Sequence, residues 1–313
     1  MLRLSPSPDR LPQPAPLDAA EAGSSLGRDA WRRLRKNKLA VASGLFLLLL
    51  VAAVLILPGL LGLSYSEQIH GQFQPPSLRA HHWFGTDLLG HDVFARVLFG
   101  CRISLAVALA ATVVSLVIGV SWGAIAGYAG GKTDTVMMRI VDIIYSLPFT
   151  LFVILLLVFA DGLAKRFQLG PTWNVLVLFI AIGAVEWLTM SRIVRGQTLG
   201  LKHKEFVEAA RAAGLSQAGV ISRHIIPNLL GPVVVYVTLT IPAVILAESF
   251  LSFLGLGVQP PMASLGTLIA GGAQDMELAP WLLIFPALTM VVTLMSFNFI
   301  GDGLRDAIDP KDR

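Results

Sequence analysis

The sequence predicts an all-α integral membrane protein with six transmembrane helices and both termini in the cytoplasm. Three observations predict this fold class. Hydrophobic residues make up 55% of the 313 residues, charged residues make up only 14%, and the mean hydropathy is +0.71. A soluble domain cannot bury that much apolar surface. Six segments reach the roughly 20 apolar residues that a span needs, and Lys and Arg are concentrated in alternate connections.

The six apolar segments are separated by polar or glycine-rich connections. The third contains Pro148 and the fifth contains Pro242. Membrane helices tolerate such breaks where neighbouring helices satisfy the freed backbone groups. The predicted spans are Leu39–Leu61, Ile103–Tyr128, Val136–Ala160, Trp173–Ile193, Leu229–Leu254 and Trp281–Ile300.

The distribution of Lys and Arg sets the orientation. With the N-terminus inside, 19 of the 24 Lys and Arg residues fall on inner segments, which is the asymmetry expected for a cytoplasmic side. The two long external segments are then about 62–100 and about 255–280, and a short external turn joins the third and fourth spans. The segment at 255–280 has no Lys or Arg. The outer cations are Arg79, Arg96, Arg102, Lys165 and Arg166.

The first 38 residues form a separate region before the transmembrane domain at 39–313. Residues 1–27 are rich in Pro, Ala and Ser and lack the apolar core of a signal peptide, which predicts a disordered cytoplasmic tail. Residues 28–38 are strongly basic and include Trp31. They suit either an interfacial helix facing anionic lipid or a simple positive flank of the first span.

A polar island at residues 205–228 interrupts the apolar chain between the fourth and fifth spans. Good helix formers fill 204–213, and Gly214 lies where a left-handed residue would end that helix. Ser216 can cap a second helix that runs to Ile226, where Pro227 is placed to end it. The island therefore predicts helix, glycine turn, helix, on the inner side of the membrane.

The composition of the island favours contact with another protein. Small side chains would let a partner backbone approach closely, and Glu208 and Arg211 would supply charge at the edge of that surface. A solvated loop without a partner is the alternative. The small residues are Ala209, Ala210, Ala212 and Ala213.

The same residues carry a resemblance to a known family. Glu208-Ala209-Ala210, then Gly214, then His224-Ile225-Ile226-Pro227 resembles the EAA loop of ABC importer permeases, although the general pattern has Ile and Leu at the positions of His224 and Ile226. The Arg223–Asn228 segment is similar to the peptide-permease branch. Further matching segments are HWFGTDLLGHDVFARVLFG at 82–100 (with His91 where Arg is usual), AGYAGGKTDTVMMR at 126–139, RGQTL at 195–199, KEFVEAA at 204–210, SFLGLG at 252–257, APW at 279–281 and FNFIGDGLRDAIDPKDR at 297–313. Together they most resemble the C-type membrane subunit of the oligopeptide branch.

The resemblance implies a type I ABC importer-like permease in a bacterial inner membrane. It implies a non-catalytic subunit that forms half of a peptide pathway, with a homologous second permease, two cytoplasmic ATP-binding subunits and an external solute-binding protein as partners. ATP and Mg would be bound by the partner subunits, so no cofactor is expected in this chain. The cytoplasmic coupling loop would be about 194–228. Its expected docking residues are Glu205, Glu208, Ala209, Ala210, Arg211, Gly214, Leu215 and Ser216.

Ionisable groups inside spans are costly and often functional. Glu186 lies nearest a span centre and could line the translocation path, pair with the partner permease or hold two helices together. Glu248 lies toward the outer end of the fifth span, where we expect it to be wetted and to face the path. Asp142 is three residues from Arg139, a spacing that predicts a local ion pair.

Several other sequence patterns resemble functional motifs but do not predict a function for this chain. Ala126–Thr133 satisfies a relaxed phosphate-loop pattern, but it lies at the inner end of a span and no strand precedes it. His81, His82 and His91 with Asp87 and Asp92 do not have the spacing of a known metal site, so no metal is expected.

Gly119, Gly123 and Gly127 form a small-residue row that suits close packing of an unspecified helix. The single cysteine excludes an internal disulfide, and nucleic acid is an unexpected partner because no basic patch is interleaved with aromatic residues.

Other functions remain as alternatives. Dipeptides or metal chelates could be the substrate within the same family, because the binding protein largely selects it. A membrane-embedded enzyme would need nucleophiles or metal ligands clustered at one depth, which Asp142, Glu186 and Glu248 do not provide. A stand-alone channel or secondary transporter would not need the polar island and would usually show internal repeats.

Overall fold

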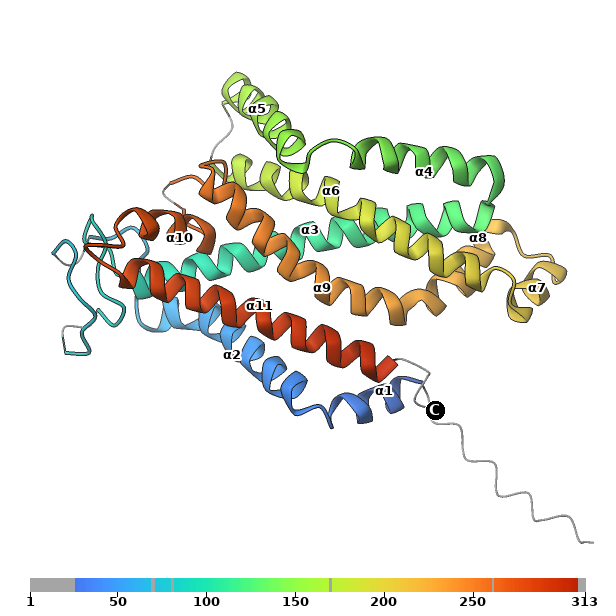
Figure 1. Cartoon of the computed structure of the whole chain (residues 1–313), viewed down its shortest axis with the longest axis horizontal. Helices are drawn as coiled ribbons and strands as arrows, with labels where there is room; N and C mark the ends of the chain where they lie inside the picture. The colour runs from blue at the N-terminus through green and yellow to red at the C-terminus, as the bar shows by residue number, and fades with distance from the viewer. Residues whose placement is uncertain (1–25, 69–70, 80–81, 169–170, 261, 309–313) are drawn as a thin grey trace, which may run out of the picture.

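The chain folds into a bundle whose long helices run from one end of the molecule to the other (Figure 1). The structure is a computed structural model that describes every residue except 1–25, 69–70, 80–81, 169–170, 261 and 309–313. Almost all of the predicted tail lies outside the described residues. The elements are α1 (Leu26–Leu34), α2 (Lys38–Leu60), α3 (Val93–Ala129), α4 (Gly131–Tyr145), α5 (Phe149–Phe167), α6 (Pro171–Leu201), α7 (Glu205–Ala212), α8 (Gln217–Val220), the π-turn η1 (Ile221–Ile225), α9 (Ile226–Phe253), α10 (Leu265–Gln274) and α11 (Trp281–Ile308).

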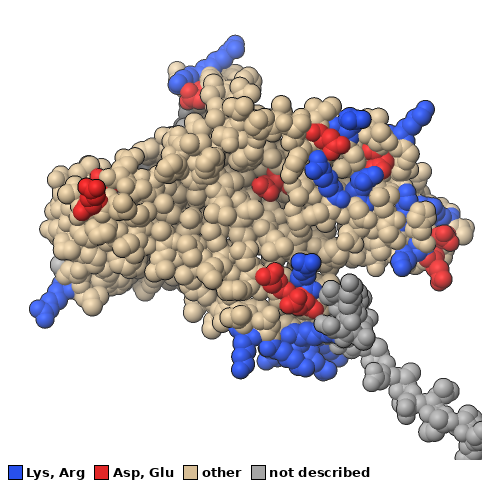
Figure 2. All heavy atoms as spheres, in the orientation of Figure 1, with Lys and Arg blue, Asp and Glu red and all other residues tan. Residues whose placement is uncertain are grey.

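The all-α fold class is confirmed. Among the described residues, β-structure is limited to three isolated bridges between residues 68 and 92. Five helical stretches are long and apolar enough to cross a membrane, and a bent sixth forms if α4 and α5 together count as one span. Charged side chains gather toward the ends of the molecule, whereas the middle of the face in Figure 2 is almost free of them. That distribution suits a hydrocarbon environment around the middle of the bundle.

The third predicted span is sharply bent in the structure. α4 and α5 meet at an angle of 84° across residues 146–148. The ring of Pro148 disfavours helical backbone at Leu147, and the Ser146 hydroxyl donates to the Ile143 carbonyl at 2.7 Å as α4 ends. By contrast, Pro242 lies buried within helix α9, which continues through it.

The second span begins earlier than predicted. Helix α3 starts at Val93, and the side chain of Asp92 caps it by accepting from the Phe94 N–H at 2.8 Å. Arg96 and Arg102 lower the hydropathy of this first stretch, so a window based on apolar length misses it. Residues 93–100, expected to belong to the external segment, are therefore the outer end of a long helix.

The glycine row on α3 packs against α6, a partner that the sequence does not identify. A Cβ added at Gly119 would lie 2.6 Å from the Met190 Cβ, and one at Gly123 would lie 2.4 Å from the Ser191 carbonyl oxygen. A Cβ at Gly127 would lie 2.8 Å from the Thr198 Cβ. Such distances are far inside van der Waals contact, so any larger side chain would force the two helices apart.

The described chain ends share one end of the bundle. Helix α1 and the C-terminal end of α11 lie toward the same end as α7, whereas α10 and the 62–92 segment lie at the other (Figure 1). We refer to these as the inner end and the outer end. The assignment of the inner end to the cytoplasm stays a prediction from the charge asymmetry.

Candidate coupling surface at the inner end

The polar island, residues 205–228, begins with a helix that ends as the sequence predicts. Helix α7 stops at a left-handed Gly214, with φ of +83°. The Leu215 N–H donates to the Ala210 carbonyl at 3.2 Å, and the Gly214 N–H donates to the Arg211 carbonyl at 2.9 Å. These paired bonds form a Schellman motif, which satisfies carbonyls that the helix end would leave open. The turn prediction at Gly214 is confirmed.

The second helix of the island starts where expected but does not end at Pro227. Ser216 caps α8, because its hydroxyl accepts from the Gly219 N–H at 3.2 Å. The helix then passes through the π-turn η1, where the Ile226 N–H donates to the Ile221 carbonyl five residues back. This wider turn absorbs Pro227 into the first turn of α9. Helices α8, η1 and α9 therefore form one continuous 37-residue span from Gln217 to Phe253.

One face of the island is buried against the bundle. Val207 and Ala210 of α7 pack with Val220, Ile225 and Leu229, and Leu215 covers the edge of the same cluster. The cluster continues into the inner ends of α3 and α6 through Ala124, Tyr128, Met190 and Val194. Burying this apolar face fixes the island to three spans at once. It also corrects one expectation, since Ala210 faces the core at 7% exposure and cannot contact a partner.

The opposite face of α7 is exposed and combines acidic, small and aromatic side chains. Glu205, Glu208 and Ala209 are exposed, and Phe206 exposes 39% of its surface. A Cβ added at Gly214 would meet no atom within 4 Å, so the turn is open on its outer side. The exposed members of the expected docking set are Glu205, Glu208, Ala209, Arg211, Gly214 and Ser216.

Arg211 has a second role that the sequence does not indicate. Its Nε donates to the Tyr128 hydroxyl at 2.9 Å, and its guanidinium lies 4.8 Å from the centre of the Tyr128 ring. Tyr128 belongs to the inner end of α3, 83 residues away in sequence. The contact combines a charge-assisted hydrogen bond with a cation–π interaction and so pins α7 to α3.

Ion pairs also tie α4 to α6 beside the island. Arg195 binds Asp134 through two parallel bonds of 2.5 and 2.6 Å, a bidentate geometry. Asp142 pairs with Arg192 at 2.8 Å rather than with Arg139, so the predicted local ion pair is wrong. Arg192 also lies 4.2 Å from the centre of the Tyr145 ring. Only tertiary structure brings these partners together, because no helical spacing rule links residues this far apart in sequence.

The two acidic residues inside the spans lie in different environments. Glu186 on α6 is partly exposed and lines a cavity of about 340 Å³ beside the break between α4 and α5, together with Tyr145 and Thr189. Glu248 is fully buried, so the expectation that it is wetted is wrong. It accepts hydrogen bonds from the hydroxyls of Ser252 at 2.6 Å and Ser104 at 3.3 Å. Glu248 thus joins α9 to α3 inside this chain, and only Glu186 is kept as a candidate for the path.

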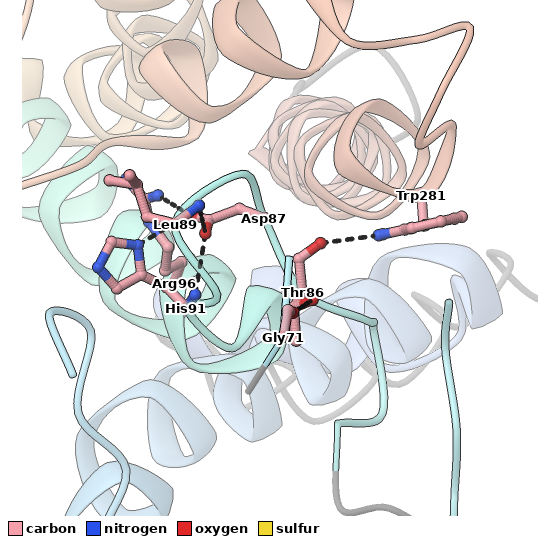
Figure 3. A network of polar contacts seen from close by, with 7 residues as sticks. All are labelled: Gly71, Thr86, Asp87, Leu89, His91, Arg96 and Trp281. Atoms are coloured by element: carbon pink, nitrogen blue, oxygen red, sulfur yellow. Dashed lines mark hydrogen bonds and ion pairs between the residues drawn. The ribbon is translucent and has the colours of Figure 1, made fainter. Parts of the chain in front are cut away.

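The outer end contains the residues first weighed as a metal site. The Asp87 carboxylate accepts the backbone N–H groups of Leu89 and His91 and the His91 Nδ1, each at 2.9 Å, and it also pairs with Arg96 (Figure 3). Next to it, Thr86 donates to the Gly71 carbonyl at 2.6 Å, and Trp281 donates to the Thr86 carbonyl at 3.2 Å. His81 lies outside the described residues. Within the described ones, no three His, Cys, Asp or Glu side chains converge as metal ligands would.

The environment of Asp87 changes its acidity. Burial alone would raise the pKa of the carboxyl, but the hydrogen bonds from His91 and the charge of Arg96 outweigh it and hold the pKa below its usual value. The carboxylate is therefore the stable form, and it organises the loop that precedes α3.

Comparison with known proteins decides the family. Residues 119–313 match the family model described as the binding-protein-dependent transport system inner membrane component. Residues 25–76 match the N-terminal transmembrane domain of oligopeptide transport permease C. The chain belongs to this family of ABC importer permeases. It is accordingly a multi-pass inner membrane protein.

Curated relatives of the permease cover nearly its whole length. The oligopeptide transport system permease protein OppC of Haemophilus influenzae is 50% identical over 93% of this chain and 90% of its own. OppC of Escherichia coli K12 is 51% identical over 93% of each chain. The dipeptide transport system permease protein DppC of Bacillus subtilis is 45% identical over 92% of this chain and 87% of its own.

A solved structure supports the fold of the permease. An inward-facing MetNI methionine ABC transporter contains a chain that aligns with a TM-score of 0.55 at 19% identity. The alignment covers 69% of this permease and 97% of that chain. At this identity the likeness concerns the fold, and it agrees with the predicted type I importer architecture.

Proposed function

We propose that this permease is one membrane subunit of an ATP-driven, binding-protein-dependent importer of oligopeptides. It would form half of the translocation path with a homologous second permease, and an external binding protein would deliver the peptide to its outer end. Two cytoplasmic ATP-binding subunits would drive the pair of permeases, and one of them would dock on the exposed face of α7 in this chain. Binding of nucleotide moves the spans only if it favours one pose of α7 over another.

The observation that carries this proposal is the two-sided character of α7. Its apolar side is locked to α3, α6 and α9, and Arg211 adds a polar link to α3. Its other side exposes Phe206 between Glu205 and Glu208. An exposed aromatic side chain with charged neighbours is a common anchor of protein interfaces. A force applied to this face is therefore carried to three spans by direct contact.

Two features support the remaining parts of the proposal. The cavity at Glu186 opens beside a broken helix, and irregular backbone at membrane depth is tolerated where it lines a protein-covered or water-filled space. The OppC names of the similar proteins favour oligopeptides as the substrate. The 45% identity to DppC of Bacillus subtilis keeps dipeptides as a second candidate.

Copurification of charge-reversal variants tests the docking surface. Glu208→Lys should weaken retention of the ATP-binding subunits by about threefold to fivefold, since a rim charge contributes modestly to affinity. Glu277→Lys is the matched control, because Glu277 is an exposed acidic residue at the outer end. Equal retention by Glu208→Lys and wild type would remove Glu208 from the docking surface. Solute flux by the purified chain without any ATP-binding subunit would overturn the proposed function.

A further inference from the structure

A dense basic surface lies where α1 joins α2, apart from the island. Within residues 28–38 the side chains of Arg28, Arg32, Arg35, Lys36 and Lys38 are exposed, and Arg33 is partly exposed. Figure 2 shows Lys and Arg side chains gathered over this part of the molecule, at the lower edge of the view. Such a density of positive charge attracts phosphate-bearing surfaces.

This basic surface contains a groove rather than a flat face. Arg33, Lys36 and Asn37 line one wall of a hollow of about 510 Å³, and Gly303, Asp306 and Ala307 of α11 line the other. The Asn37 Oδ1 accepts from the Ala40 N–H at 3.1 Å to cap α2, which fixes the orientation of the amide. The groove is thus lined by a guanidinium, an ammonium and an amide, which are donors suited to phosphate oxygens, and by one carboxylate.

Close approach of the two walls depends on Gly303. A Cβ there would lie 2.6 Å from the Ala40 Cβ and 3.2 Å from the Leu34 Cδ1. The glycine therefore lets α11 pack directly against the α1–α2 junction. The groove is a defined product of tertiary packing and not merely a charged flank of the first span.

Helix α2, which begins beside the groove, exposes an apolar face along its length. Leu45, Leu48 and Leu55 lie on that face and expose between 57% and 67% of their surfaces, and Trp31 of α1 exposes 61%. Apolar side chains of a span beside cations at its end match the two parts of a phospholipid. Acyl chains would lie on α2 while the headgroup enters the groove, and Trp31 would lie at headgroup depth.

We propose that this groove binds the headgroup of an acidic phospholipid of the inner leaflet. The phosphate diester is held by Arg33, Lys36 and the Asn37 amide, and its acyl chains pack on α2. Asp306 weakens the site, because its carboxylate faces the same phosphate across the groove. This site does not depend on the proposed import function, since no contact with the ATP-binding subunits is required.

Native mass spectrometry of the purified transporter, with lipid added to the detergent micelles, tests this site. Phosphatidylglycerol should be retained in preference to phosphatidylcholine. Arg33→Gln/Lys36→Gln should weaken phosphatidylglycerol retention about twenty-five-fold, because each cation near an anionic surface contributes about fivefold. The matched control is Lys132→Gln/Arg139→Gln, which removes two exposed cations from α4 and should change retention less than twofold.

A gain-of-affinity variant separates the proposal from misfolding. Asp306→Asn should tighten phosphatidylglycerol binding about fivefold, since it removes the opposing charge. Soluble glycerol phosphate, which has the headgroup chemistry but no acyl chains, should not displace the lipid at millimolar concentration. The proposal is overturned by equal losses in the two double variants, by equal retention of phosphatidylcholine, by weaker binding in Asp306→Asn, or by displacement with glycerol phosphate.

Discussion

The irregular segments at the two ends of the permease are stabilised in different ways. At the outer end, the Asp87 carboxylate accepts from the backbone N–H groups of Leu89 and His91, and the Thr86 hydroxyl donates to the Gly71 carbonyl. The loop before α3 is therefore held by its own polar groups. At the inner end, the polar island buries only one side of α7 and leaves the other side exposed. The outer segment is held by its internal polar contacts, whereas the inner island leaves one side of α7 exposed.

This difference predicts which end of the permease can pass a movement on to the membrane spans. A loop that is cross-linked by buried polar bonds resists local change, because breaking one leaves unsatisfied groups. A short helix fixed on one side to three spans moves as part of them when its free side is pushed. We therefore expect substitutions at the outer end to reduce stability and substitutions at the inner end to reduce coupling.

The largest effect should come from Asp87→Ala. The variant removes four interactions and leaves the Arg96 guanidinium without its carboxylate. We expect the opening free energy of residues 86–92 to fall by about 3 kcal/mol, as for loss of one partner from a largely buried ion pair. Hydrogen exchange of the backbone amides measures this opening free energy, and Glu67→Ala is the control at an exposed residue of the same segment. Unchanged protection would show that the outer segment is not held by Asp87.

Gly214→Val should have the next largest effect. A β-branched residue at a φ of +83° costs about 2 kcal/mol in backbone strain, so ATP-coupled uptake should fall at least about tenfold while membrane insertion persists. Gly214→Asn should keep most activity, because Asn tolerates this conformation. Gly131→Val is the matched control, since Gly131 is also left-handed and open but lies outside the island. Normal uptake by Gly214→Val would exclude the turn from coupling.

Loss of the contact between Arg211 and Tyr128 should have a smaller effect on ATP-coupled uptake. Arg211→Gln should slow uptake about fivefold, which corresponds to about 1 kcal/mol for a partly exposed charged hydrogen bond with a cation–π contact. A double-mutant cycle with Tyr128→Phe measures the coupling energy between the two side chains. Arg223→Gln removes an exposed cation of the same island as the control. Additive effects of the two substitutions would mean that the contact does not transmit the motion.

The pH dependence of the outer end should be the smallest effect near neutrality. The folded protein holds the pKa of Asp87 below its usual value, so the carboxylate contributes stability that is fully present above that usual value. The contribution is lost as the pH falls through the lowered folded pKa. Protection of residues 86–92, corrected for intrinsic exchange, should therefore decline only below about pH 4. The decline should vanish in Asp87→Asn, and a decline of the same size in that variant would assign it to another group.

The local features of the fold follow from sequence because they rest on local chemistry. Gly214 and Ser216 end one helix and begin the next through backbone preferences that a single residue sets. The apolar lengths of α2, α6 and α11 likewise follow from hydropathy. Pro148 and Pro227 show the limit of such reasoning, since one breaks its span by 84° and the other is absorbed by a π-turn.

The candidate site depends on contacts that no sequence spacing indicates. The inward orientation of Ala210 results from packing against helices far away in the chain, and so does the burial of Glu248 among serine hydroxyls. Arg211 and Tyr128 are adjacent only because α3 and the island share one hydrophobic cluster. Residue types alone predicted the polar island as a candidate docking region, and the structure divides that island into a buried face and an exposed face.

Site-specific labelling of α7 tests the central claim most directly. The only natural cysteine, Cys101, is fully buried, so a cysteine placed at exposed Ala209 would be the reactive thiol at the inner end. Maleimide labelling of Ala209→Cys should fall at least tenfold when the ATP-binding subunits are assembled on the permease, whereas Leu78→Cys at the exposed outer end should label equally in both states. Equal labelling of Ala209→Cys with and without those subunits would contradict the account.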